Sequence, residues 1–143
     1  MPTVLMGKDA KIYEGVAAAA LGALTEMSNV KDVKLNLSAG EADTTTRSNS
    51  GWRATSPGLR ECQVEFEMLW LDTDACFVAM KAAFLAGTTV ELAILDRDRA
   101  TGGANGPKGA FAITGFVRNE GLEEAISVSV TAKMATFTEW VSV

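Results

Sequence analysis

Hydrophobic and polar residues alternate along two segments of the chain, which lie on either side of a long polar stretch. A period of two buries one face of a β-strand and leaves the other face in contact with water. We therefore predict strands over residues 30–38 and 61–70. Their inward-facing residues are Val33, Leu35, Leu37, Val64, Phe66, Met68 and Trp70.

The polar stretch between these strands, residues 40–60, is predicted to be a loop. Connections of this length are uncommon in compact domains, and they usually either carry a function or are disordered. A disordered linker has no need of an aromatic residue such as Trp52. We therefore predict that this loop has a function.

One segment, residues 74–86, has a clear helical signature. Asp72 or Thr73 can accept hydrogen bonds from the free N–H groups of the first turn. Gly87 suits the left-handed position that follows the last turn. The sequence therefore predicts a single helix with defined ends.

Both faces of this predicted helix are apolar. Phe77, Met80 and Phe84 fall on one face, and Lys81 is the only charged residue after the first turn. A helix that is apolar on all sides is buried on both sides, so we expect another subunit to cover its second face. The alternative is an Ala-rich surface helix with weak amphipathicity.

Shorter patterns complete a mainly β chain. We predict a strand over residues 11–13, followed by a connection over residues 14–26 whose alanines permit a helix. A further strand is predicted over residues 89–95, and a hairpin is predicted from residues 109–118 and 122–137. At about 3.3 Å per residue, a strand as long as the last one must bend, wrap a barrel or project from the domain.

Composition and charge narrow the class of protein. The chain has 143 residues, 48% hydrophobic and 22% charged, which predicts one folded domain over residues 1–143. A net charge of −5 argues against a protein that reads nucleic-acid sequence.

No apolar run is long enough for a transmembrane helix, and the Ala-rich residues 16–24 lack the basic start of a secretion signal. Two cysteines favour a reducing compartment.

The sequence offers no site for catalysis, metal binding or cofactor binding. It contains no histidine, which removes Ser-His-Asp and Cys-His pairs and most zinc sites. Cys62 lies on the same face of its predicted strand as Val64 and Phe66, and Cys76 lies on the apolar helix. We therefore interpret both as buried apolar side chains. Residues 96–99, Asp-Arg-Asp-Arg, lack the later ligands of a calcium loop, and Pro107 breaks the spacing of a phosphate-binding loop. We therefore expect a protein that is not an enzyme.

Three short motifs follow one another within residues 29–70. The first is N-V-x-D-V, the second is GEAD followed by TTR-x-N-x-GWRA, and the third is V-E-F-E-M. They are formed by Asn29-Val30, Asp32-Val33, and residues 40–43, 45–47, 51–54 and 64–68. Over this third of the chain the sequence resembles the major tail tube proteins of long-tailed bacteriophages.

The resemblance implies a fold and a function. The family fold is a β-sandwich or small barrel with one flanking helix, here near residues 74–86, and a long loop between the second and third strands. Its members form hexameric rings that stack into a hollow tube, through which DNA passes without specific binding. The implied partners are further copies of this chain, together with tape-measure and tail-terminator proteins. The implied location is the virion tail, assembled in the host cytoplasm.

The resemblance also assigns two sets of residues to assembly. The long loop would contact the adjacent ring, and the helix would lie at a subunit boundary. The loop residues are Asp43, Thr45, Arg47, Gly51, Trp52 and Arg53, and the helix residues are Phe77, Lys81, Phe84 and Leu85. The competing interpretation is a monomeric β-barrel small-molecule-binding protein, which needs a sizeable apolar cavity.

Overall fold

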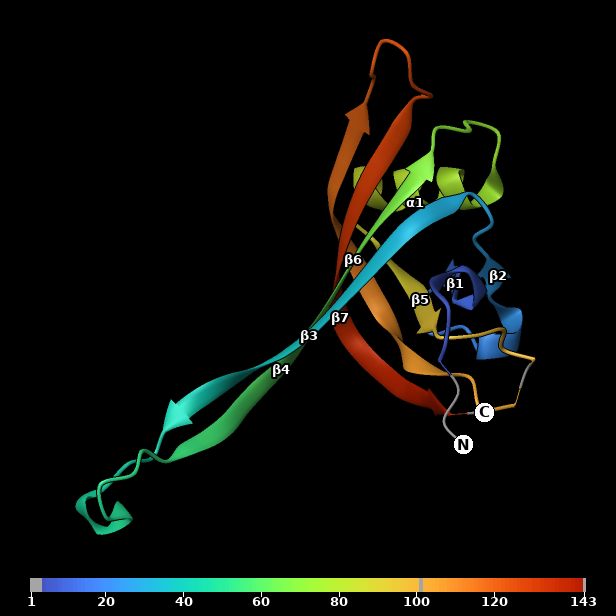
Figure 1. Cartoon of the computed structure of the whole chain (residues 1–143). Coiled ribbons are helices and arrows are strands. Elements are labelled where there is room, and N and C mark those ends of the chain that lie inside the picture. Colours follow the sequence, from blue (N-terminus) through green and yellow to red (C-terminus); the bar gives the residue numbers. More distant parts are fainter. Residues whose placement is uncertain (1–3, 101, 143) are drawn as a thin grey trace.

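A computed structural model describes residues 4–100 and 102–142 and shows one antiparallel sheet with a helix packed on it (Figure 1). The seven strands follow the order β2-β1-β5-β6-β7-β4-β3. Their bounds are β1 Lys11–Val16, β2 Thr25–Glu26, β3 Val30–Asp43, β4 Thr55–Leu69, β5 Thr89–Leu95, β6 Asn105–Asn119 and β7 Ser127–Ser142. The helix α1 spans Ala75–Ala86, and short 3₁₀ turns cover Gly7–Asp9, Leu21–Ala23 and Arg47–Asn49. The predicted mainly β fold with one flanking helix is confirmed.

One face of the sheet and the inner side of α1 enclose the main hydrophobic core. The predicted alternation holds in β4, where Val64, Phe66 and Met68 are buried and the residues between them are partly exposed. Phe77 and Met80 of α1 belong to the same core. Burying a large apolar side chain contributes about 1.5–3 kcal/mol. A register slip of one residue would turn all three β4 side chains to the opposite face, so this core fixes the strand register.

The helix α1 begins at Ala75, one residue later than predicted, and ends at Ala86 as predicted, but the residue that caps it differs. Asp74 precedes the first turn, and its carboxylate accepts a hydrogen bond of 3.0 Å from the Phe77 N–H group. The expectation of Asp72 or Thr73 in this role is therefore wrong, because the helix begins later than assumed. Gly87 ends the helix at a φ of 70°, a left-handed conformation that favours glycine.

A second, smaller core lies along β5 and includes Ala93 and Leu95 on that strand. Because β5 is buried along almost its whole length, the Glu91 carboxylate lies inside the protein. It accepts hydrogen bonds from the Lys108 Nζ at 2.7 Å, the Thr138 hydroxyl at 3.0 Å and the Ala18 N–H group at 3.1 Å. One carboxylate thus connects β5 to β6, to β7 and to the segment after β1.

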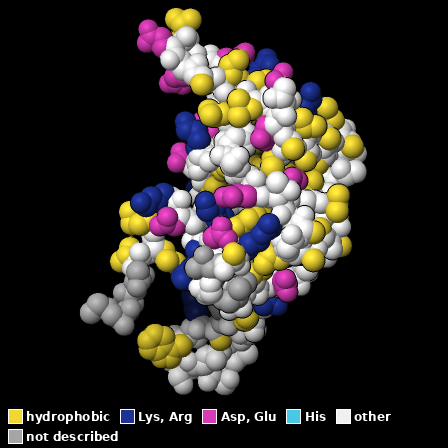
Figure 2. All heavy atoms as spheres, turned by 90° about the vertical axis from the view of Figure 1, so that its right-hand side faces the viewer, with side chains coloured by type: hydrophobic (Ala, Val, Ile, Leu, Met, Phe, Trp, Pro, Cys, Tyr) yellow, Lys and Arg dark blue, Asp and Glu magenta, His cyan; other side chains and the backbone are white. Residues whose placement is uncertain are grey.

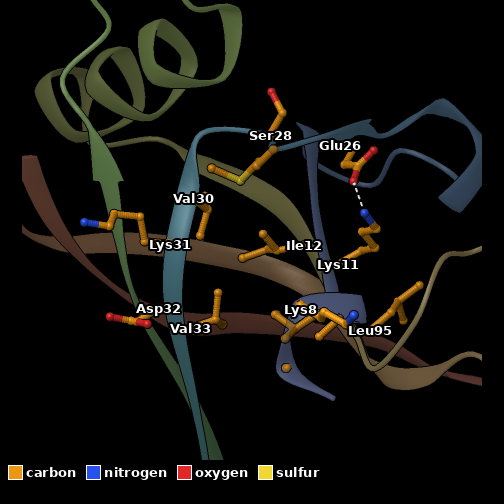
Figure 3. A pocket seen from close by; sticks show the side chains of 14 residues that line it. Lys8, Lys11, Ile12, Glu26, Ser28, Val30, Lys31, Asp32, Val33 and Leu95 are labelled. Carbon is orange, nitrogen blue, oxygen red and sulfur yellow. Dashed lines mark ion pairs between the residues drawn. The ribbon is translucent and has the colours of Figure 1, made fainter. Parts of the chain in front are cut away.

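The sheet curls without closing, so one open sheet stands in place of the expected barrel or sandwich. Between β1 and β3 lies an open hollow lined by residues such as Ile12, Val30 and Val33 (Figure 3). Lys11 and Glu26 form an ion pair of 3.0 Å beside it. A barrel needs a continuous ladder of hydrogen bonds between its first and last strands. The edge strand β2 has only two residues and is paired to β1 alone, so no such ladder forms among the described residues.

Several elements run further than the sequence pattern predicted. β1 continues to Val16, and the 3₁₀ turn Leu21–Ala23 lies where the alanines permitted a longer helix. β6 begins at Asn105, four positions earlier than predicted, and β7 runs from Ser127 to Ser142 in place of residues 122–137. β6 and β7 pair along almost their full length. Backbone pairing therefore extends these strands through residues that show no alternation.

Gly106→Ala should destabilise the protein strongly. A Cβ atom at this position would lie 1.7 Å from the Ile94 carbonyl oxygen. Because the clash is with backbone, no side-chain rotation relieves it, and we expect the free energy of unfolding to fall by about 3 kcal/mol. Gly22→Ala, with nothing within 4 Å of the new Cβ, is the matched control. Denaturant unfolding measures both variants, and equal stabilities would contradict the close approach of β5 and β6.

The two thiols should resist alkylation in the folded protein. Cys62 and Cys76 are buried and unpaired, and burial raises the pKa of both thiols, that of Cys76 to about 12. Relative to an ordinary value of 9.0, the Cys76 thiolate at pH 8 is about a thousandfold scarcer. Iodoacetamide at pH 8 should therefore modify both residues rapidly in guanidinium chloride and very slowly in buffer. Equal rates by mass spectrometry in the two conditions would show that these thiols are accessible.

Candidate assembly site

The predicted loop over residues 40–60 is mostly a β-hairpin that projects from the body of the subunit (Figure 1). β3 continues to Asp43 and β4 begins at Thr55, which leaves residues 44–54 as the turn. The strands continue without a core because their backbone groups pair with each other. From Cys62, where burial in β4 begins, the hairpin strands extend roughly 25 Å at about 3.3 Å per residue.

A β-bulge lies at the base of the hairpin. Ala39 pairs with Arg60 and Glu41 pairs with Pro57, so Gly40 alone opposes two residues of β4. One of these is Gly58, whose added Cβ would lie 3.2 Å from the Gly40 carbonyl oxygen. A bulge increases the local twist of a strand pair. The hairpin therefore leaves the sheet with its faces turned relative to those of the subunit.

The tip of the hairpin is held by its own hydrogen bonds. Thr46 and Asn49 form a capping box around the turn Arg47–Asn49, and the Thr46 N–H donates to Asn49 Oδ1 at 2.5 Å. The Thr45 hydroxyl accepts a hydrogen bond of 2.8 Å from the Ala54 N–H across the turn. The Thr45 side chain and N–H also hydrogen-bond to Asp43, which lowers the pKa of that carboxyl group. Asp43 and Thr45 therefore build the tip.

The other residues predicted for this region are presented to solvent. Trp52 is 78% exposed, and Arg47 and Arg53 of the same tip are exposed as well. Gly51 has a φ of 84°, a left-handed conformation that a side chain would strain. The structure thus brings all six predicted loop residues into one tip, which exposes one aromatic ring and two cations. Leu59, which is 89% exposed on the hairpin, is an apolar residue that the sequence analysis did not single out.

The outer face of α1 is a second apolar surface. Leu85 is 71% exposed, and Val78 on the same helix is about half exposed. Phe84 is partly covered, because its ring stacks on Phe116 at a centroid distance of 5.8 Å. Phe77, in contrast, is buried in the subunit's own core and is not available to a neighbour. Of the predicted helix residues, Lys81, Phe84 and Leu85 therefore reach the surface, and Phe77 does not.

The sheet face opposite the main core is polar. Lys34 of β3 pairs with Glu65 of β4, and Glu65 in turn pairs with Thr131 of β7. Glu67 lies next along β4 on this face, and Lys133 lies on β7 opposite Gln63. Neighbouring opposite charges and hydroxyl groups keep this broad face hydrated.

The Asp-Arg-Asp-Arg run at residues 96–99 serves the fold. The Arg99 guanidinium lies 4.7 Å from the centre of the Tyr13 ring. It also donates hydrogen bonds to the carbonyl oxygens of Leu21 and Leu24 at 2.9 and 2.5 Å. Within residues 4–100 and 102–142, no three His, Cys, Asp or Glu side chains gather where they could hold a metal ion. In the same ranges no helix has the length and hydrophobicity needed to cross a membrane.

Comparisons with known proteins identify a family and several related folds. A family model described as phage tail tube protein matches residues 6–136. No curated protein matches the chain. Several solved structures share the fold. The tail of an empty GTA particle, refined with C6 symmetry, has a TM-score of 0.76 and 19% identity, with 98% of this chain and 99% of that chain covered.

The second structure, the virion of a native gene transfer agent particle, has a TM-score of 0.75 and 19% identity, covering 95% of this chain and 100% of that chain. The third, the SPP1 tail tube, has a TM-score of 0.74 and 18% identity, covering 97% of this chain and 78% of that chain.

Proposed function

This chain belongs to the phage tail tube protein family, and from that premise we propose that its subunits close into hexameric rings that stack into a hollow, DNA-conducting tube. Family membership makes the chain a structural subunit of a tail tube and a component of the virion, and the family is not enzymatic. The observation that carries the proposal is the hairpin, a long paired projection that contributes nothing to the subunit's own core.

Ring closure is supported by the two different edges of the sheet. β3 forms one edge over fourteen residues, and β2 with the end of β1 forms the other. An unpaired strand edge presents N–H and C=O groups that can pair with another chain. Because the two edges differ, such pairing is head-to-tail, and head-to-tail contacts generate rings when the rotation closes. The C6 symmetry of the similar GTA tail supports six subunits.

The channel wall is the polar sheet face that carries Lys34, Glu65, Glu67 and Lys133. The opposite face is covered by the core and α1, which leaves the polar face free to line a water-filled passage. Binding to DNA gains strength when cations displace counterions from phosphates. A chain of net charge −5 gains little binding strength in this way, so it lets DNA pass.

Tape-measure and tail-terminator proteins are further partners, and assembly takes place in the host cytoplasm.

The competing small-molecule binder has less support. A small-molecule binder of this kind requires a closed barrel around an apolar cavity. The sheet is open, and the hollow beside Ile12 and the groove beside Leu37 are both open to solvent. Exposed apolar residues instead include Val78 and Leu85 on α1 and Trp52 and Leu59 on the hairpin. Surfaces of this kind mark protein–protein contacts.

Leu85→Asp should impair assembly far more than folding. Leu85 is mostly exposed, so we expect the subunit to lose less than about 1 kcal/mol of stability. Burying an aspartate in a subunit contact should abolish oligomers at concentrations where the wild type assembles. Ala75→Asp, on the exposed first turn where a carboxylate suits the helix dipole, is the matched control. Sedimentation and thermal unfolding measure the two effects, and unchanged oligomers in Leu85→Asp would contradict a contact at this face.

Replacing residues 41–57 with a short Gly/Ser turn should abolish stacking and leave the sheet folded. The replacement joins Gly40 to Gly58, which already lie against each other, and removes no buried core residue. We expect circular dichroism to show a folded β protein and electron microscopy to show separate rings. Full-length tubes from this variant would refute the stacking role. A globally unfolded chain would show instead that the hairpin is needed for the subunit's own fold.

A further inference from the structure

An apolar groove runs along the base of the hairpin, where it meets the second half of β7. Leu37 and Leu59 line it from the hairpin, and Met134, Phe137 and Trp140 line it from β7. Four of these side chains are about half exposed or more: Leu37, Leu59, Phe137 and Trp140. An exposed apolar surface of this kind is typical of an interaction site.

Part of the hairpin beside this groove is positively charged. Residues 44–60 carry Arg47, Arg53 and Arg60 and no carboxylate, whereas Glu41 and Asp43 lie on the first strand and Glu61 lines the groove beside Arg60. None of the three arginines forms an ion pair with the described part of the chain. A segment that binds here should therefore combine an apolar side chain with carboxylates.

The connection between β6 and β7, residues 120–126, has this composition. It carries Glu120, Glu123 and Glu124 and no basic residue, and Leu122 is fully exposed between them. In Figure 1 this connection lies at the top of the molecule, and the hairpin tip lies at the opposite, lower end. Figure 2 likewise shows acidic and hydrophobic side chains at the uppermost point of the molecule.

We propose that the β6–β7 connection of a second copy of this chain docks on the hairpin, with Leu122 in the apolar groove and its glutamates facing the hairpin arginines. The inference rests on the proposed function, and it names the surface that receives the hairpin of the adjacent ring. Because the two surfaces lie at opposite ends of one chain, the contact is head-to-tail. A head-to-tail contact along an axis does not close, so it repeats from ring to ring.

Charge reversal tests this pairing. Arg53→Glu/Arg60→Glu and Glu123→Lys/Glu124→Lys each place like charges against one another, and we expect each double variant to form at least tenfold less tube, measured by pelleting and electron microscopy. A chain carrying all four substitutions restores the opposite charges and should recover tubes to within about twofold of wild type. Glu120 stays unchanged because it lies 3.6 Å from Arg118.

Asp9→Lys is the control, because it makes the same change of charge per substitution at an exposed position outside the groove lining and outside residues 120–126, and it should assemble normally. Normal tubes from Glu123→Lys/Glu124→Lys, or no recovery in the fourfold variant, would overturn the pairing while leaving the tail tube function intact. A wild-type chain that never forms rings or tubes would instead refute the proposed function itself.

A cross-link provides a second, geometric readout. In a chain with Cys62 and Cys76 replaced by serine, Leu59→Cys and Leu122→Cys together should yield a ladder of disulfide-linked chains when tubes are oxidised. Either substitution alone should give no ladder longer than a dimer. Assembled tubes of the paired variant that remain monomeric on a non-reducing gel would contradict the placement of Leu122 in the groove.

Discussion

The buried Glu91 carboxylate is the constraint on which the arrangement of the sheet depends. A charge without exposure to water is tolerated only when it is paired and hydrogen-bonded. Its three partners come from β6, β7 and the segment after β1, so these elements must converge on β5. The long β6–β7 pair is thereby fixed against the short N-terminal strands, and the remaining strands β4 and β3 are added outward from β7.

The sequence predicts local structure well where side-chain pattern and burial agree. Alternation in β4 marked its buried residues, and the residues after α1 marked its end. The sequence could not predict that Glu91 is buried. A charged residue in an alternating strand indicates a solvent-exposed face unless a lysine distant in the sequence is known to lie beside it. The barrel expectation was wrong for a related reason: closure depends on pairing between strands far apart in the sequence. The hairpin strands were missed because both of their faces are polar, which removes the period-two signal.

The residues that form the subunit's core are distinct from the apolar and hairpin residues that it leaves exposed. Phe77 and Met80 turn inward, whereas Leu85 and Val78 on the same helix turn outward. In the same way β4 is buried from Cys62 onward and exposed throughout the hairpin. The residues that stabilise the monomer therefore differ from those that stay uncovered, and each set can be altered without the other.

The capping box at the hairpin tip has a consequence for the entropy of association. A flexible loop loses conformational freedom when it binds, and each immobilised side chain costs about 0.5–1.5 kcal/mol. Here Thr46 and Asn49 hold the backbone of the turn in place within a single chain. The backbone ordering is thus completed during folding. In the stacking proposed above, more of the free energy of each contact would remain to hold neighbouring copies together, and the tip would meet its partner as a preformed shape.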